Sequence, residues 1–173
     1  MRSIHKKWFI MVTVCLLVVS YSGSLGAETA LETKPVLSLQ IAKKIADASE
    51  AKAVAEGWNM DIAIVDDGAN LLLFRRMPNA FLGSIDIAID KAKTSARMTM
   101  PTRVIADITY GEDRKGGPVP GLAHMKGFTA FAGGLPIRVG NTVIGAIGVS
   151  GASADQDEAC AQAGIDAVAE LLK

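Results

Sequence analysis

His124 and Tyr110 are the two side chains of this sequence best suited to bind iron. They lie between Pro101 and Gly127, a region with many glycines and prolines and little hydrophobic periodicity. Imidazole and phenolate are both axial ligands in haem proteins, so His124 is the leading candidate ligand and Tyr110 the second. A single loop histidine is also commonly a surface residue, and one histidine cannot build a conventional zinc site.

Two arginines and two glycines are further candidates for ligand contact. Arg75 and Arg76 follow a predicted strand, and a guanidinium can bind a carboxylate, such as a haem propionate, through two parallel hydrogen bonds. Gly145 and Gly148 lie in a predicted strand, where a missing side chain permits the close approach of a flat ligand, a helix or another subunit. A solvated strand end and packing glycines are the structural alternatives, and both interpretations stay open.

No conventional catalytic constellation is present. Ser150 stands near glycines, but the sequence departs from the Gly-x-Ser-x-Gly pattern of a nucleophile elbow, because Ala152 occupies the last position. A hydrolase is therefore a distant alternative. Cys160 lies among alanines, which favours a buried packing role rather than a reactive thiol.

These candidates must be positioned by helices and strands that the sequence also predicts. A helix over residues 38–56 begins with Ser38 as its cap and stops at Gly57. A last helix follows the capping box that starts at Ser153 and runs to about Leu172. The acidic residues of its first turn favour the positive end of the helix dipole, although they could also bind a cation. These acidic residues are Asp155, Asp157 and Glu158.

A middle helix follows Ser84, a second possible cap. Its alanines recur at helical spacing, which predicts close packing against a neighbour. Its basic residues are expected on other faces, where they could also receive a carboxylate: Lys91, Lys93 and Arg97. A short helical piece is predicted near 102–108, before the irregular region.

Five strands are predicted. Two of them bracket Asp66-Asp67-Gly68, a strong hairpin signal. The second strand is apolar without alternation, so both of its faces are expected to be covered. Hairpin connections between helices favour an α+β fold with a five-stranded antiparallel sheet flanked by helices. The predicted strands are residues 60–65, 69–74, 128–131, 135–139 and 142–149.

The first 27 residues have the pattern of a secretory signal peptide. Basic residues precede the uncharged apolar run Trp8–Val19, and small residues lead to a cleavage site after Gly26 or Ala27. The run is shorter than the ~20 residues of a membrane span, so no span is expected after cleavage. Residues 28–36 form a lead-in, and 37–173 a single domain. We expect a periplasmic or secreted protein, with an uncleaved anchor as the alternative.

The charge balance excludes one class of partner. The sequence has 18 basic and 18 acidic residues, and the signal segment removes basic residues only. The mature chain is therefore slightly acidic, which predicts no nucleic-acid footprint. A single cysteine after cleavage, Cys160, excludes an intramolecular disulfide.

The order and spacing of several segments resemble the GlcG/HbpS-like family, which is related to the C-terminal part of PduO-type proteins. The resemblance covers roughly Leu37 to Leu172. It implies a profilin-like α/β/α sandwich, assembly into homo-oligomers, and haem or tetrapyrrole binding for some members. The segments that carry it are Ile64–Leu71, Asp90-Lys91-Ala92, Phe131–Ile137, Ile144–Gly151 and Asp155–Glu158.

The resemblance makes an exported haem-binding protein the leading hypothesis for function, in haem sensing, storage or turnover. Exported relatives in such a family imply a membrane sensor kinase as a possible partner. The family's haem-degrading label implies at most weak activity of that kind. Two alternatives stay open: a binding module for a small organic acid or corrinoid that uses Arg75 and Arg76, and an oligomeric interaction protein without a ligand.

Overall fold

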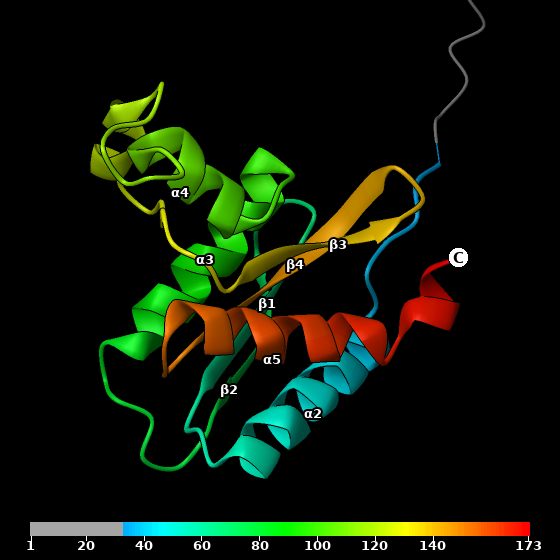
Figure 1. Ribbon diagram of the computed structural model, residues 1–173. Helices are drawn as coiled ribbons and strands as arrows, with labels where there is room; N and C mark the ends of the chain where they lie inside the picture. Colours follow the sequence, from blue (N-terminus) through cyan, green and yellow to red (C-terminus); the bar gives the residue numbers. More distant parts are fainter. Residues whose placement is uncertain (1–32) are drawn as a thin grey trace, which may run out of the picture. The chain divides into compact units, whose positions relative to one another are not determined.

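A computed structural model describes residues 33–173 (Figure 1). The predicted signal segment and most of the lead-in lie outside the described residues. Within the described part, no helix is both long and apolar enough to cross a membrane.

A four-stranded antiparallel sheet forms the centre of the domain. Its strands lie in the order β2-β1-β4-β3. The two inner strands, β1 and β4, are almost fully buried, because helices cover both faces of the sheet. The strands are β1 (Asp61–Asp66), β2 (Leu71–Arg76), β3 (Gly134–Val139) and β4 (Thr142–Ser150).

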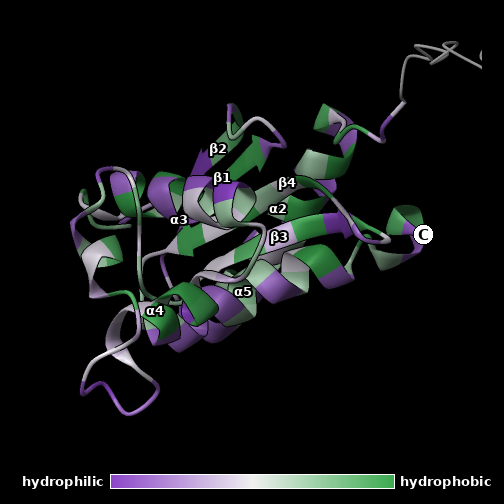
Figure 2. Cartoon of the chain, turned by 90° about the horizontal axis from the view of Figure 1, so that it is seen from above, coloured by the Kyte–Doolittle hydropathy of each residue, from purple (hydrophilic) through white to green (hydrophobic). Residues whose placement is uncertain are grey.

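Three helices complete an α/β/α sandwich (Figure 1). Helices α2 (Leu39–Glu56) and α5 (Ala154–Asp166) pack together and cover one face, over a core that includes Ile62 and Ile147. Helix α3 (Ser84–Met98) covers the other face through its alanines. The expected α+β class and sandwich architecture are therefore confirmed. In Figure 2 the strands carry long hydrophobic stretches, whereas α5 alternates between hydrophilic and hydrophobic residues.

The predicted helix ends are largely confirmed. Ser38 accepts a hydrogen bond from the backbone N–H of Ile41 at 3.2 Å, and Gly57 ends α2 in the left-handed conformation, with a φ of 74°. Ser153 and Gln156 form the predicted reciprocal capping box of α5. This helix ends earlier than predicted, at Asp166, and a short 3-10 helix, η3 (Ala169–Leu172), follows it.

Helix α4 (Thr102–Tyr110) and the 3-10 helix η2 (Pro120–His124) occupy the region expected to be irregular. The predicted helical piece near 102–108 is thus confirmed and slightly longer. Helix α4 packs against α3, β3 and η2, so it connects the sandwich to the segment that holds His124.

The prediction of a fifth strand at 128–131 is wrong. This segment has no regular secondary structure, and the backbone N–H of Thr129 donates to the Thr94 hydroxyl of α3 at 2.9 Å. A helix side chain therefore takes the hydrogen bond that a strand neighbour would have taken. The segment runs along α3 and enters β3 at Gly134.

Two local expectations are also corrected. Strand β2 is half-exposed, because it is an outer strand of the sheet and the fully buried strand of the hairpin is β1. The hydroxyl of Ser84 does not cap α3, since Gly83 is the N-cap and the hydroxyl contacts the Asp61 carboxylate at 2.6 Å. In the hairpin turn, the positive φ falls on Ala69, at 62°.

Candidate functional site

A cavity of about 470 Å³ opens beside α4, and we call it the α4 cavity. Three segments far apart in the sequence form it: one face of α4 with the residues just after it, the irregular segment 130–132, and the first turn of α5. Its volume falls within the ~300–1,000 Å³ of typical ligand sites. Its lining residues are Arg103, Ala106, Tyr110, Arg114, Ala130, Phe131, Ala132, Ala154 and Asp155.

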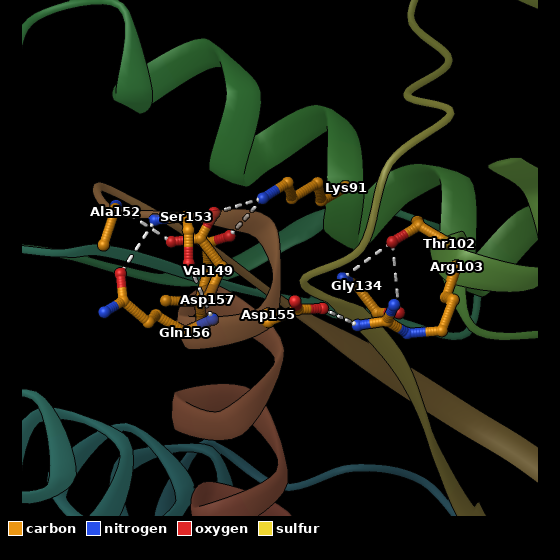
Figure 3. A network of polar contacts seen from close by, with 10 residues as sticks. All are labelled: Lys91, Thr102, Arg103, Gly134, Val149, Ala152, Ser153, Asp155, Gln156 and Asp157. Atoms are coloured by element: carbon orange, nitrogen blue, oxygen red, sulfur yellow. Dashed lines mark hydrogen bonds and ion pairs between the residues drawn. The ribbon is translucent and has the colours of Figure 1, made fainter. Parts of the chain in front are cut away.

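Arg103 is the best-anchored charged group of the α4 cavity. Its Nε lies 3.0 Å and 3.2 Å from the two carboxylate oxygens of Glu158. Its Nη2 lies 2.5 Å from Asp155 Oδ1 (Figure 3). Hydrogen bonds with Asp155 and then Glu158 raise the pKa of Arg103 above its ordinary value. The guanidinium therefore stays charged, is held in one orientation, and remains 42% exposed at the cavity.

Tyr110, Arg114 and Asp155 supply the other polar side chains of the cavity. Tyr110 is the last residue of α4, and its side chain is well exposed. Arg114 lies in the loop after α4, with its Nη2 3.4 Å from Asp107 Oδ1. The cavity thus combines one phenol, two guanidinium groups and one carboxylate with alanine methyl groups and an aromatic ring.

An ion pair lies directly behind this cavity. Lys91 of α3 and Asp157 of α5 are fully or almost fully buried, and their Nζ and Oδ2 atoms are 2.6 Å apart (Figure 3). Lys91 Nζ also donates to the Val149 carbonyl oxygen at 2.9 Å, and Asp157 Oδ1 accepts from the Ala152 backbone N–H at 3.0 Å. The pair therefore joins α3, the end of β4 and the start of α5.

Burial disfavours the charged form of both members of this pair. Loss of solvation lowers the pKa of Lys91 and raises the pKa of Asp157, and in both cases the attraction of the partner counteracts the shift without cancelling it. Such a pair contributes little net stability compared with apolar residues, but either partner alone would be a costly buried charge.

Phe131 connects the buried pair to the α4 cavity. Its ring centroid lies 4.7 Å from Lys91 Nζ, a distance typical of a cation–π contact. Phe131 also lines the cavity and is 43% exposed. The three ammonium hydrogens of Lys91 therefore have three partners: a carboxylate, a carbonyl oxygen and an aromatic face.

The structure brings only one of the predicted site residues into the α4 cavity. Tyr110 lines it, whereas His124 is exposed at the end of η2 and is not among the lining residues. Arg75 pairs with Asp47 and Glu50 of α2, at 2.7 Å and 2.6 Å. The role of His124 and Tyr110 as ligands stays a prediction.

Arg76 and the two strand glycines also lie away from this cavity. Arg76 donates to the Ala80 carbonyl oxygen at 3.0 Å. A methyl group at Gly148 would overlap the backbone of Ala88 and Ala92, so this glycine admits α3. A methyl group at Gly145 would overlap the Val65 carbonyl oxygen of β1. In this chain, both glycines therefore make room for a neighbouring segment of the protein's own backbone.

Lys91, Asp157 and Arg103 are the site residues that the sequence interpretation missed or misassigned. Lys91 was expected on another face of its helix than the packed alanines, but it is buried. Gly133 lets the backbone lie against its ammonium group, since a methyl group at Gly133 would be 2.6 Å from Lys91 Nζ. Asp157 was assigned to the helix dipole, although its carboxylate binds Lys91. The sequence did mark Lys91 and Asp157 as unusual, since both belong to the segments that carry the family resemblance.

Metal and nucleophile sites are not evident in residues 33–173. No group of three or more histidine, cysteine, aspartate or glutamate side chains in this part of the chain could hold a metal ion. Cys160 is fully buried, and burial raises the pKa of its thiol to about 11, which agrees with a packing role.

Comparison with known proteins gives the family. The sequence model of the family described as "Haem degrading protein HbpS-like" matches residues 37–166. An uncharacterised 15.0 kDa protein from the dhaT-dhaS intergenic region of Citrobacter freundii is 37% identical over 137 residues, which cover 78% of this chain and 94% of that protein.

Two solved structures share the fold. A double mutant of HbpS from Streptomyces reticuli superposes with a TM-score of 0.72 and 32% identity, covering 83% of this chain and 93% of that one. The structure of a PduOC–haem complex superposes with a TM-score of 0.71 and 29% identity, covering 77% and 95%. The resemblance to the GlcG/HbpS-like family predicted from the order and spacing of several segments is therefore confirmed, and the chain belongs to the HbpS-like family.

Proposed function

We propose that this protein binds haem, or a closely related tetrapyrrole, in the α4 cavity. Membership of the HbpS-like family and the likeness to a PduOC–haem complex favour this ligand class. The observation that carries the proposal is the cavity itself, whose lining includes the Tyr110 phenol, two guanidinium groups and the Phe131 side chain.

The residues of the cavity fit the chemistry of haem. Phenolate oxygen is a known haem ligand, and Tyr110 is the residue of the cavity that would supply it. Arg103 and Arg114 would receive the propionate carboxylates, since guanidinium groups bind carboxylates through charge-assisted hydrogen bonds. Bound haem would supply the redox chemistry of its iron.

Each part of the cavity has a separate task in this proposal. Arg103 orients the acid groups, because Asp155 and Glu158 already fix its guanidinium. Phe131 and the alanine methyl groups cover the ring system and exclude water from it. His124 lies on η2, which packs against α4, and remains the alternative ligand.

A haemin titration followed by absorption spectroscopy tests this proposal. We expect residues 28–173 to give a saturable Soret shift. Tyr110→Phe keeps the ring and removes the oxygen, so it should change the spectrum and weaken binding, whereas His124→Ala should leave both unchanged. A changed spectrum in His124→Ala alone would move the ligand to η2. Failure of the wild type to bind haemin would contradict the proposal.

A small organic acid or a corrinoid is the second candidate ligand. The two guanidinium groups of the α4 cavity favour an acid group in general. Arg75 and Arg76 are less suited to this task than the sequence suggested, since neither lines the α4 cavity. Thermal unfolding measured with a panel of such ligands would reveal one that binds only the folded state, because it raises the melting temperature.

We also propose that the protein is exported and assembles into homo-oligomers. Export rests on the signal pattern of residues 1–27, which lies outside the described residues. Intact-mass analysis of the protein recovered outside the cytoplasm should show cleavage after Gly26 or Ala27, and an uncleaved mass would support the anchor. Light scattering of residues 28–173 tests assembly, and a monomeric mass would contradict it.

A further inference from the structure

Phe131 has an unusual environment for an exposed aromatic residue. It lies in a segment without regular secondary structure, yet its ring sits over a buried ammonium group, with 4.7 Å between the ring centroid and Lys91 Nζ. Lys91 is fully buried, so the cation lies on the inner face of the ring. Phe131 is also one of the residues that line the α4 cavity.

The backbone next to Phe131 is held from three sides. The Gly133 carbonyl oxygen accepts from the Val149 N–H at 2.9 Å. The Gly134 N–H donates to the Thr102 hydroxyl at 2.9 Å (Figure 3). Gly133 has a φ of 119°, and a methyl group there would lie 2.6 Å from Lys91 Nζ. Helix α4, strand β4 and the buried pair therefore all fix the chain that presents this ring.

We propose that Phe131 is a preorganised stacking platform for a flat conjugated ring system, and that Lys91 is the positioning residue that holds it. This inference rests on the proposed function and deepens it, because it states what the cavity recognises. The recognised ligand is a planar conjugated acid, whose ring stacks on Phe131 and whose carboxylates bind Arg103. The metal at the centre of the ring is not required for recognition.

The chemistry of the contacts supports this division of tasks. An aromatic ring offers a favourable surface to another π-system whatever its substituents, and a ring already fixed in place loses little conformational freedom on binding. Asp157 and the Val149 carbonyl oxygen hold the ammonium group behind the ring. A metal ligand such as Tyr110 would then set the coordination of a bound iron but not the affinity for the ring system.

Metal-free protoporphyrin IX is the probe that separates these contributions. Its fluorescence polarisation should rise saturably with residues 28–173. Phe131→Leu keeps an apolar side chain and removes the ring, and we expect it to weaken binding about tenfold, the effect of one aromatic stacking contact. Phe131→Tyr should restore binding. Phe81→Leu is the matched control, because Phe81 is also exposed and lies outside the cavity lining.

The role of Lys91 is tested by a double-mutant cycle. In the Lys91→Met/Asp157→Asn protein, which removes both charges, Phe131→Leu should cause a smaller loss of protoporphyrin affinity than in the wild type. Equal losses in both backgrounds would show that Lys91 does not act through Phe131. Circular dichroism of each variant checks that the fold is kept.

The possible failures can be told apart. If haemin binds but protoporphyrin does not, recognition depends on the metal, and the platform is refuted while haem binding stands. If both bind and Phe131→Leu behaves like Phe81→Leu, the platform is refuted and the ligand class stands. If neither binds, the proposed function fails, and the platform fails with it.

Discussion

The buried Lys91–Asp157 pair predicts that removing one charge lowers the stability of the protein far more than removing both. Lys91→Met removes the cation with little change of volume and leaves the Asp157 carboxylate buried without its charged partner. Removing one partner of such a pair costs about 3–5 kcal/mol of unfolding free energy. Small domains have only about 5–15 kcal/mol in total, so the melting temperature should fall by on the order of 10 °C.

Removal of both charges should restore most of this loss. In Lys91→Met/Asp157→Asn no charge is buried, and an amide oxygen can still accept from the Ala152 N–H that now binds Asp157. Replacing a whole buried ion pair is often nearly neutral. The double variant should therefore be more stable than Lys91→Met alone.

Urea unfolding followed by circular dichroism measures these differences. Lys93→Met is the matched control, because Lys93 lies on the same helix but is partly exposed, and its free energy of unfolding should change by less than about 0.5 kcal/mol. A cost below about 1 kcal/mol for Lys91→Met, or a double variant no more stable than the single one, would refute the assignment of a buried ion pair.

Three further predictions concern packing and the burial of Cys160. Gly148→Ala should destabilise the protein by about 1–3 kcal/mol or more in urea unfolding, because the new methyl group overlaps the backbone of α3, whereas Gly121→Ala, with open space around it, should be nearly neutral. Cys160 should resist iodoacetamide in the folded protein, as judged by intact mass, and rapid labelling would contradict its burial. Since burial raises the pKa of its thiol from 9.0 to about 11, the folded state keeps this proton in a pH range where the unfolded chain loses it. Stability should therefore fall between pH 9 and 11 relative to Cys160→Ala, and identical pH profiles of the two proteins would contradict the shift.

Local signals in the sequence predicted much of the fold. Ser38, Gly57 and the capping box at Ser153 act within one or two turns of their own helix, so their chemistry is visible in a short window. The hairpin was predicted for the same reason. The alanine spacing of the middle helix correctly indicated close packing, which α3 makes against the inner strands.

Long-range contacts account for what the sequence did not predict. The segment 128–131 has strand-like residues, but Thr94, more than 30 positions earlier, takes its hydrogen bond. In the sequence Lys91 looks like any other helical lysine, because its contacts with Asp157 and Gly133 form only in the folded protein. A charged residue is expected at the surface by default, and only the family resemblance marked this one as unusual.

The candidate site was predicted in part. The chemistry of Tyr110 predicts a ligand, and Tyr110 lines the α4 cavity, whereas no pattern in the sequence indicates Arg103, which also lines it. The position of Arg103 depends on the packing of α4 against the start of α5, where Arg103 pairs with Asp155 and Glu158. No local sequence pattern indicates that long-range contact. Arg75 was considered because it follows a strand, and the acidic residues of α2 that bind it lie 25 and 28 positions away.

Blocking the α4 cavity tests the central claim most directly. Ala130 lines the cavity, and Ala130→Trp would fill it, whereas Ala55→Trp places the same side chain on the exposed surface of α2. We predict that Ala130→Trp lowers the affinity for haemin at least tenfold in an absorption titration, while Ala55→Trp binds like the wild type. Equal haemin binding by a folded Ala130→Trp protein would contradict the location of the site.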